Sequence, residues 1–188
     1  MIDWTRLQLV LIIVVLLLVI VGFYLRGLAA RLDRLHLRVD ASTAALESRL
    51  DRRSSLAQEV ALAGVLDPAS SVLLLNAATT ARHAKEQRDA AESDLSAALR
   101  AVFPDQETVD EVDTDDATHA LLVELGEVCT GVVLARRFAN DATRAAVAVR
   151  RRGLVRALRL AGRAPWPASR DLDDAPPEAL AGLALDTA

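Results

Sequence analysis

LQLVLIIVVLLLVIVGFYL, residues 7–25, is the stretch that decides how this chain folds. Its residues are apolar apart from Gln8 and Gly22, and no charged residue lies between Arg6 and Arg26. As a helix rising about 1.5 Å per residue it would be roughly 28 Å long, close to the hydrocarbon thickness of a bilayer. A helix that is apolar on every face has no place on the surface of a soluble domain. We therefore predict a single transmembrane helix over residues 7–25.

The flanks of this stretch favour a retained anchor over a cleaved signal peptide. Trp4 precedes the stretch, and Phe23 and Tyr24 lie at its end, where aromatic rings prefer the headgroup zone. A signal peptide has a basic first segment, a shorter apolar run and a small-residue cleavage site. Residues 1–6 (MIDWTR) instead carry one acidic and one basic side chain, and the apolar run is longer.

The basic residues around the span predict its orientation. Before the span, Arg6 is opposed by Asp3, whereas several arginines follow it closely: Arg26, Arg31, Arg34 and Arg38. The positive-inside rule then leaves residues 1–6 outside and the rest of the chain in the cytoplasm. The lone cysteine, Cys129, agrees with a reducing compartment, because one thiol forms no disulfide within the chain. We expect a single-pass protein of the cytoplasmic membrane.

The remainder of the chain predicts an all-α fold. It is rich in Ala, Leu, Val and Arg and poor in aromatic residues, and its apolar positions recur every three or four residues. We expect residues 26–162 to form a long antiparallel bundle of about three helices. The first continues from the anchor to a turn at Gly64, the second covers residues 69–102, and the third runs from about Thr118 to Gly162. Asp67 and Pro68 are well placed to begin the second helix. Residues 163–188, which carry several Pro and Asp residues, are expected to be disordered.

An acidic segment, residues 105–116, separates the second and third predicted helices. It carries seven acidic residues and no basic one. One interpretation is a solvated connection whose last aspartates favour the positive end of the next helix. Another is a complement to the arginines that follow the span. Calcium loops need ordered ligands around a glycine turn, and this segment has no glycine, so we expect no metal site here.

A basic run lies near the end of the third predicted helix. Its arginines include Arg150, Arg151, Arg152, Arg156 and Arg159. They fit a solvated helix face near the negative end of the helix dipole. Alternatively they form a surface for a protein partner or for acidic lipid. Nucleic acid is not an expected partner, because no aromatic platform or binding motif accompanies them.

Two segments resemble the LemA family of membrane-anchored helical proteins. LESRLDRRSSLAQEV (residues 46–60) is similar to that family's first-helix pattern, and LARRFANDATR (residues 134–144) to a late-helix pattern. Ala139 stands where family members usually place a tyrosine. The resemblance implies an anchored helical bundle and no established catalytic residues. Within the two segments, a polar contact between helices is expected from four residues: Arg52, Arg53, Asn140 and Asp141.

The chain shows no motif that points to catalysis. It has no phosphate-binding glycine loop and no nucleophile elbow, and its histidines are scattered at positions 36, 83 and 119. We expect no catalytic, cofactor-binding or metal-binding residues. The function that remains is a non-enzymatic scaffold or adaptor that binds membrane proteins or copies of itself. A bundle that binds acidic lipid is the alternative, and a metal-dependent enzyme is third.

Overall fold

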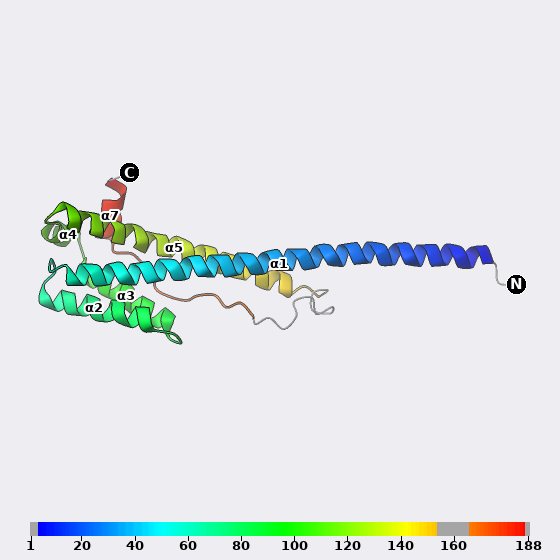
Figure 1. Cartoon of the computed structure of the whole chain (residues 1–188), viewed down its shortest axis with the longest axis horizontal. Coiled ribbons are helices and arrows are strands. Elements are labelled where there is room, and N and C mark those ends of the chain that lie inside the picture. Colours follow the sequence, from blue (N-terminus) through cyan, green and yellow to red (C-terminus); the bar gives the residue numbers. More distant parts are fainter. Residues whose placement is uncertain (1–3, 154–165, 187–188) are drawn as a thin grey trace. The chain divides into compact units, whose positions relative to one another are not determined.

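The computed structural model describes residues 4–153 and 166–186, and every regular element within them is an α-helix, as predicted (Figure 1). The helices are α1 (Trp4–Leu62), α2 (Pro68–His83), α3 (Arg88–Val102), α4 (Gln106–Val112), α5 (Asp116–Arg150) and α7 (Glu178–Asp186). The chain divides into two compact units. The first unit contains Met1–Asp40 and Ala142–Pro167, and the second contains Ala41–Asp141 and Ala168–Ala188.

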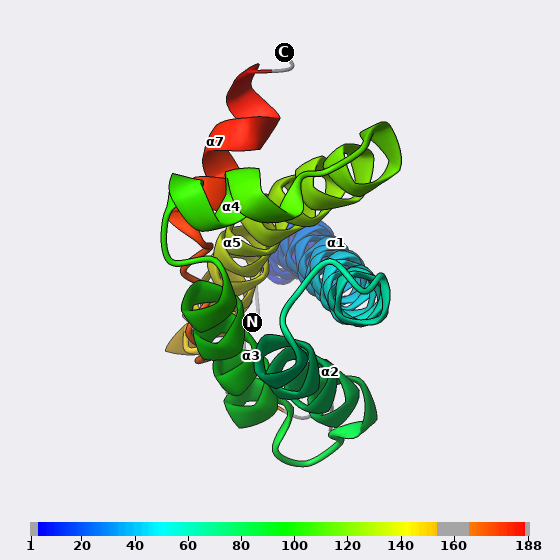
Figure 2. The ribbon, with the colours of Figure 1, turned by 90° about the vertical axis from the view of Figure 1, so that its left-hand side faces the viewer.

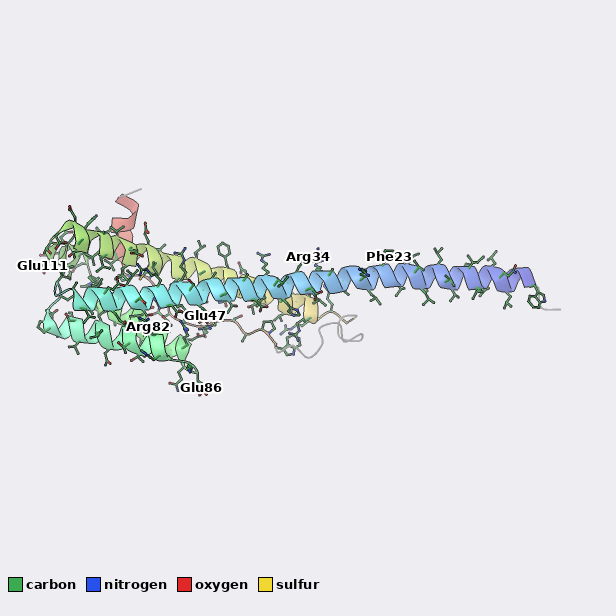
Figure 3. All side chains as sticks on the ribbon, viewed as in Figure 1. Phe23, Arg34, Glu47, Arg82, Glu86 and Glu111 are labelled. Carbon is green, nitrogen blue, oxygen red and sulfur yellow. The ribbon has the colours of Figure 1, made fainter. Side chains whose placement is uncertain are left out.

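The first unit holds the apolar part of α1. The large apolar side chains from Leu7 to Tyr24 are all exposed, and Figure 3 shows side chains projecting from all sides of the helix around Phe23. The stretch Leu7–Leu62 is long and apolar enough to cross a membrane, with a mean hydropathy of 3.0 in its most apolar window. Helix α5 meets the same criterion with a hydropathy of 1.4, but 39% of its window is buried, as in a core helix. Length and composition fit a membrane span and a signal sequence alike.

The second unit is a helical bundle around one main core. Viewed end-on, the last part of α1 and helices α2, α3 and α5 surround that core (Figure 2). Each contributes fully buried side chains, among them Leu56, Leu74, Leu95, Leu99, Leu122 and Leu125. A smaller cluster joins α1 to α5 through Leu46, Leu50, Val132 and Ala139. The apolar stripes that predicted α1, α3 and α5 are therefore largely the faces that these helices bury, whereas in α2 the stripe residue Val72 is exposed and Leu74 is buried instead.

The predicted second helix, residues 69–102, is in fact two helices. Helix α2 ends at His83, where the following residue, Ala84, has extended backbone angles (φ −67°, ψ 127°), and α3 begins at Arg88. The chain turns back there, with Glu86 in the loop (Figure 3), and α2 and α3 pack against each other. The segment expected to form one of about three bundle helices therefore forms two, α2 and α3. The turn brings the small buried residues of α2 and α3 into one core.

The start of α2 confirms the predicted cap. Asp67 Oδ1 accepts hydrogen bonds from the backbone N–H groups of Ala69 and Ser70, at 2.9 and 3.1 Å, and Pro68 is the first residue of the helix. Hydrogen bonds from Ser70 lower the pKa of the Asp67 carboxyl. The cap satisfies backbone donors that would otherwise have no partner in the first turn.

The acidic segment is more ordered than a plain connection. It contains α4, whose Val109 and Val112 are buried. Asp105 caps α4 through Thr108 N (2.9 Å), and Asp115 caps α5 through Thr118 N (2.8 Å). The interpretation that the last aspartates favour the start of the next helix is thus confirmed for Asp115, whose pKa is lowered by that backbone bond. The arginines that follow the span belong to the first unit, so their pairing with this segment stays a prediction.

The C-terminal region differs from the predicted disordered tail. Residues 166–177 form no helix or strand, and α7 follows them. We call residues 168–186 the C-terminal arm and residues 168–175, which precede α7, the strap. Leu172 and Leu180 of the arm are buried, and a Cβ atom added at Gly126 of α5 would collide with the Leu180 carbonyl oxygen. The parts of the predicted third helix and tail at residues 154–165 and 187–188 lie outside the described residues.

Candidate functional site

A buried ion pair joins α1 to α3 in the second unit. The side chain of Arg53 is 1% exposed and that of Glu92 is fully buried. Arg53 Nη2 lies 2.7 Å from Glu92 Oε2 and also donates to the Glu92 main-chain carbonyl at 3.1 Å. Arg53 Nη1 donates to Ser96 Oγ at 2.9 Å. One guanidinium therefore binds two residues that lie one turn apart on α3.

Burial and neighbouring charges act on Glu92 in opposite directions. Burial raises the pKa of its carboxyl, and the positive charges of Arg53 and Arg88 oppose that rise. Arg88 also pairs with Glu47 and Asp51 of α1, at 2.8 and 2.5 Å, so two arginines and three acids link α1 to α3. Removing one member of a buried ion pair leaves an uncompensated charge, so Arg53 and Glu92 each depend on the presence of the other.

The main chain of the strap is bound by side chains of α3 and α5. Asn140 binds both main-chain groups of Arg170: Asn140 Nδ2 donates to the carbonyl at 3.0 Å, and Arg170 N donates to Asn140 Oδ1 at 2.8 Å. Three residues farther on, Asp173 N donates to Ser93 Oγ at 2.9 Å, and Ser96 Oγ lies 2.7 Å from the Asp173 carbonyl. Ser96 therefore touches both the buried ion pair and the strap.

The side chains of the strap meet groups of opposite charge. Arg170 lies between Glu47 of α1 (2.8 Å) and Asp89 of α3 (2.7 Å). Farther along, Arg100 of α3 holds Asp173 at 2.6 Å, and Arg136 of α5 holds Asp174 through two bonds of 2.6 and 2.8 Å. The hydrogen bond from Arg100 lowers the pKa of Asp173, and the bond to Asp174 raises the pKa of Arg136. We call the receiving side chains the groove: Glu47, Asp89, Ser93, Ser96, Arg100, Arg136 and Asn140.

An open pocket of about 720 Å³ lies at the start of the strap. It is lined by Glu47 of α1, by residues 84–90 and by residues 168–170. Figure 3 labels Glu47 on α1, and the bond from Arg170 fixes the direction of its carboxylate. Charges of both signs line the pocket, and Arg88 and Arg170 among them pair with Glu47 and Asp89.

The described residues offer little for metal binding or nucleophilic chemistry. Among them, no group of three or more His, Cys, Asp or Glu residues is arranged to hold a metal ion. Burial raises the pKa of the Cys129 thiol to about 11, so this residue is a protonated thiol at neutral pH.

The four residues of the predicted polar contact do not form it as expected. Arg53 binds Glu92 and Ser96, Arg52 binds Glu124 Oε1 of α5 at 2.9 Å, and Asn140 binds the main chain of Arg170. Asp141, next to Asn140, is exposed. The contact was predicted as one among all four residues; Arg52, Arg53 and Asn140 instead each bind a different partner. The sequence contains no signal for Arg170, because it lies in a stretch with the composition of a disordered tail.

The basic run divides into different environments. Arg150 is 6% exposed, and its guanidinium carbon lies 4.7 Å from the ring centroid of Trp166, a cation–π contact within the first unit. Arg151 and Arg152 are exposed, and Arg156 and Arg159 lie outside the described residues. Arg150 therefore does not belong to an open docking surface, which corrects its assignment from sequence.

No protein-family model, curated protein or solved structure matches this chain. The resemblance to the LemA family rests on residues 46–60 and 134–144 alone.

Proposed function

We propose that this chain is a membrane-anchored helical scaffold that binds other membrane proteins or copies of itself and carries out no catalysis. One observation supports the proposal most: α1 is one continuous helix, Trp4–Leu62, with two kinds of surface. Its first part exposes apolar side chains on all sides, and its last part buries Leu50 and Leu56 in the bundle. A fully apolar helix is stable in hydrocarbon and unstable in water.

The proposed topology places residues 1–6 outside and the bundle in the cytoplasm. Labelling of intact cells with a membrane-impermeant thiol reagent tests it, using one chain with a cysteine added before Trp4 and another with a cysteine added after Ala188. The natural Cys129 is buried and gives little background. Labelling is expected only at the N-terminal cysteine. Labelling of the C-terminal cysteine on intact cells would contradict the orientation.

Binding of partners is tested by crosslinking the full-length chain in native membranes and identifying the attached proteins. The matched control is Leu56→Asp, which keeps the anchor but places a charge in the main core. The scaffold predicts a reproducible set of membrane proteins, or the chain itself, on the wild type and their loss from the control. Identical sets on both chains would contradict specific binding by the bundle.

The alternatives have less support. One residue of the proposed lipid-binding surface, Arg150, is buried against Trp166 and is therefore not available to bind acidic lipid. Steeply salt-dependent binding of the full-length protein to added anionic vesicles would restore this alternative. Stoichiometric iron or manganese in the purified protein would favour the metal-dependent enzyme. Membership of the LemA family is likewise a proposal, supported by the two segments that resemble it.

A further inference from the structure

The strap is ordered by contacts with the groove rather than by its own structure. One hydrogen bond within it closes a turn, from Ala175 N to Asp173 Oδ1. Its other main-chain bonds described above go to side chains of α3 and α5, with Asn140 binding both main-chain groups of Arg170. A segment whose main chain is bound by side chains of another element is held as a peptide ligand is held.

The charges make the fit directional. Reading from the N-terminal end, the strap carries one basic residue, Arg170, followed by three acidic ones, and the side chains of two of these, Asp173 and Asp174, pair with the groove while that of Asp171 is exposed. The groove presents two acidic side chains and then two basic ones, in the matching order. A reversed or shifted strap would place like charges together, so the groove accepts this sequence in one register.

The second half of the arm narrows the choice of occupant. Leu180 of α7 is fully buried in the main core, and its main chain lies against Gly126. A foreign peptide that matched only the strap would leave this core position empty or would have to compete with the attached α7. The same arm from a second copy satisfies both the groove and the core position.

The chain between α5 and the strap is long enough for the arm to reach another molecule. Residues 151–167 join Arg150 to the strap, and a chain of that length spans at most roughly 60 Å when extended, once Trp166 has left its contact with Arg150. Exchange of arms between two copies keeps every contact of the groove and of Leu180, so the connection, the contact of Trp166 with Arg150 and the entropy of association distinguish the two arrangements. Anchoring both copies in one membrane raises their effective concentration.

We propose that the C-terminal arm also seats in the groove of a second copy, so that two anchored chains join by exchanging residues 168–186. This inference rests on the proposed function, because it identifies the surface through which the scaffold binds itself. Each groove in the pair is completed by the partner's arm, and the interface is the same on both chains.

Cysteine pairing between two differently tagged full-length chains tests the exchange in membranes. Both chains carry Cys129→Ala; one also carries Ser93→Cys and the other Asp173→Cys, because Ser93 Oγ binds Asp173 N at 2.9 Å. Exchange predicts a disulfide-linked species that carries both tags. A single chain with both Ser93→Cys and Asp173→Cys should form the bond internally and shows that the geometry permits it.

A matched control replaces Ser93→Cys by Val72→Cys on α2, where the side chain is 67% exposed and lies outside the groove. Random collisions in the membrane would form a disulfide with Val72→Cys as readily as with Ser93→Cys. Arm exchange would form it with Ser93→Cys and not with Val72→Cys. An internal disulfide in the double-cysteine chain without any dual-tagged species would overturn the proposal, as would equal linking of the Val72 control.

A second measurement uses no cysteine. The fraction of full-length protein that migrates as a dimer in detergent should fall when Leu180→Asp prevents α7 from seating in either copy. An unchanged dimer fraction, or a wild type that is wholly monomeric, would overturn arm exchange. If the wild type still captures other membrane proteins in that case, the scaffold stands and only the exchange fails.

Discussion

The two ends of α1 show how differently one helix can use apolar residues. Residues 7–24 are apolar around the whole circumference, and their large side chains are exposed. Near the other end, Leu46, Leu50 and Leu56 lie on one face and are fully buried, while Arg52 on another face is exposed and binds Glu124. The helical conformation is the same, so the arrangement of apolar residues, rather than their number, tells which surroundings each end requires.

The largest expected effect comes from charges in the first of these regions. Leu16→Arg combined with Val19→Arg should release the protein from the membrane, because each arginine near the centre of a span costs about 2.5–3.5 kcal/mol. Carbonate extraction of membranes measures the retained fraction. The control is Leu37→Arg with Val72→Arg, two exposed positions outside the predicted span, which should leave the protein in the membrane. Equal release of both variants would remove the distinction between the two ends.

The next effect tests the polar group buried at the other end of α1. Arg53→Met should lower the free energy of unfolding by about 3–5 kcal/mol, because it leaves the buried Glu92 carboxylate without its partner. Chemical denaturation of the full-length protein in detergent, followed by circular dichroism, measures the change. Arg53→Met combined with Glu92→Met removes both charges and should recover much of the loss. A double variant as unstable as the sum of the single ones would show that the two charges are not coupled.

A truncation at each end compares the two regions directly. Leu56→Ala should destabilise the bundle by about 2–5 kcal/mol, because it leaves a cavity in the main core. The same change at the other end, Leu16→Ala, removes an exposed side chain and should leave bundle unfolding unchanged. Denaturation midpoints of the two variants give the comparison. A similar loss of bundle stability in both variants would contradict the assignment of Leu16 as an exposed residue.

The smallest effect is the pH dependence of the strap. The folded-state pKa of Asp173 is lowered by its hydrogen bond from Arg100, so the carboxylate adds stability above its unfolded value of 3.8. That stability is lost as the pH falls through the lowered folded-state pKa. Because Asp173 is 47% exposed, the effect should stay below about 1 kcal/mol. Asp173→Asn should make the free energy of unfolding less dependent on pH at acid pH. Asp171→Asn should leave that pH dependence unchanged.

Most helices of the second unit were predictable, because each buries a stripe of residues spaced three and four apart. The turn at residues 84–87 was not, because AKEQ contains no glycine or proline and its residues favour helix. Packing of α2 against α3 decides the turn, and such long-range packing leaves no local signal.

The groove was predictable only in part. Ser96 of the groove and Glu92, which binds Arg53 beside it, lie next to Leu95 and Leu99 on the buried face of α3, and polar residues on a buried face indicate a polar contact. Their partners were not predictable, because Arg53 and the strap lie far from them in the sequence. The strap itself has the composition of a disordered tail, and its order comes from side chains on three other helices.

The seat of Leu180 has a consequence for how the protein is made. Because that leucine fills a position in the main core, the bundle is incomplete until Leu180 has been synthesised and has left the ribosome. A nascent chain that ends before Glu178 already contains the long helices, yet it presents an unfilled apolar position to chaperones and proteases. A nonsense codon shortly before that of Leu180 would therefore damage the interior of the protein.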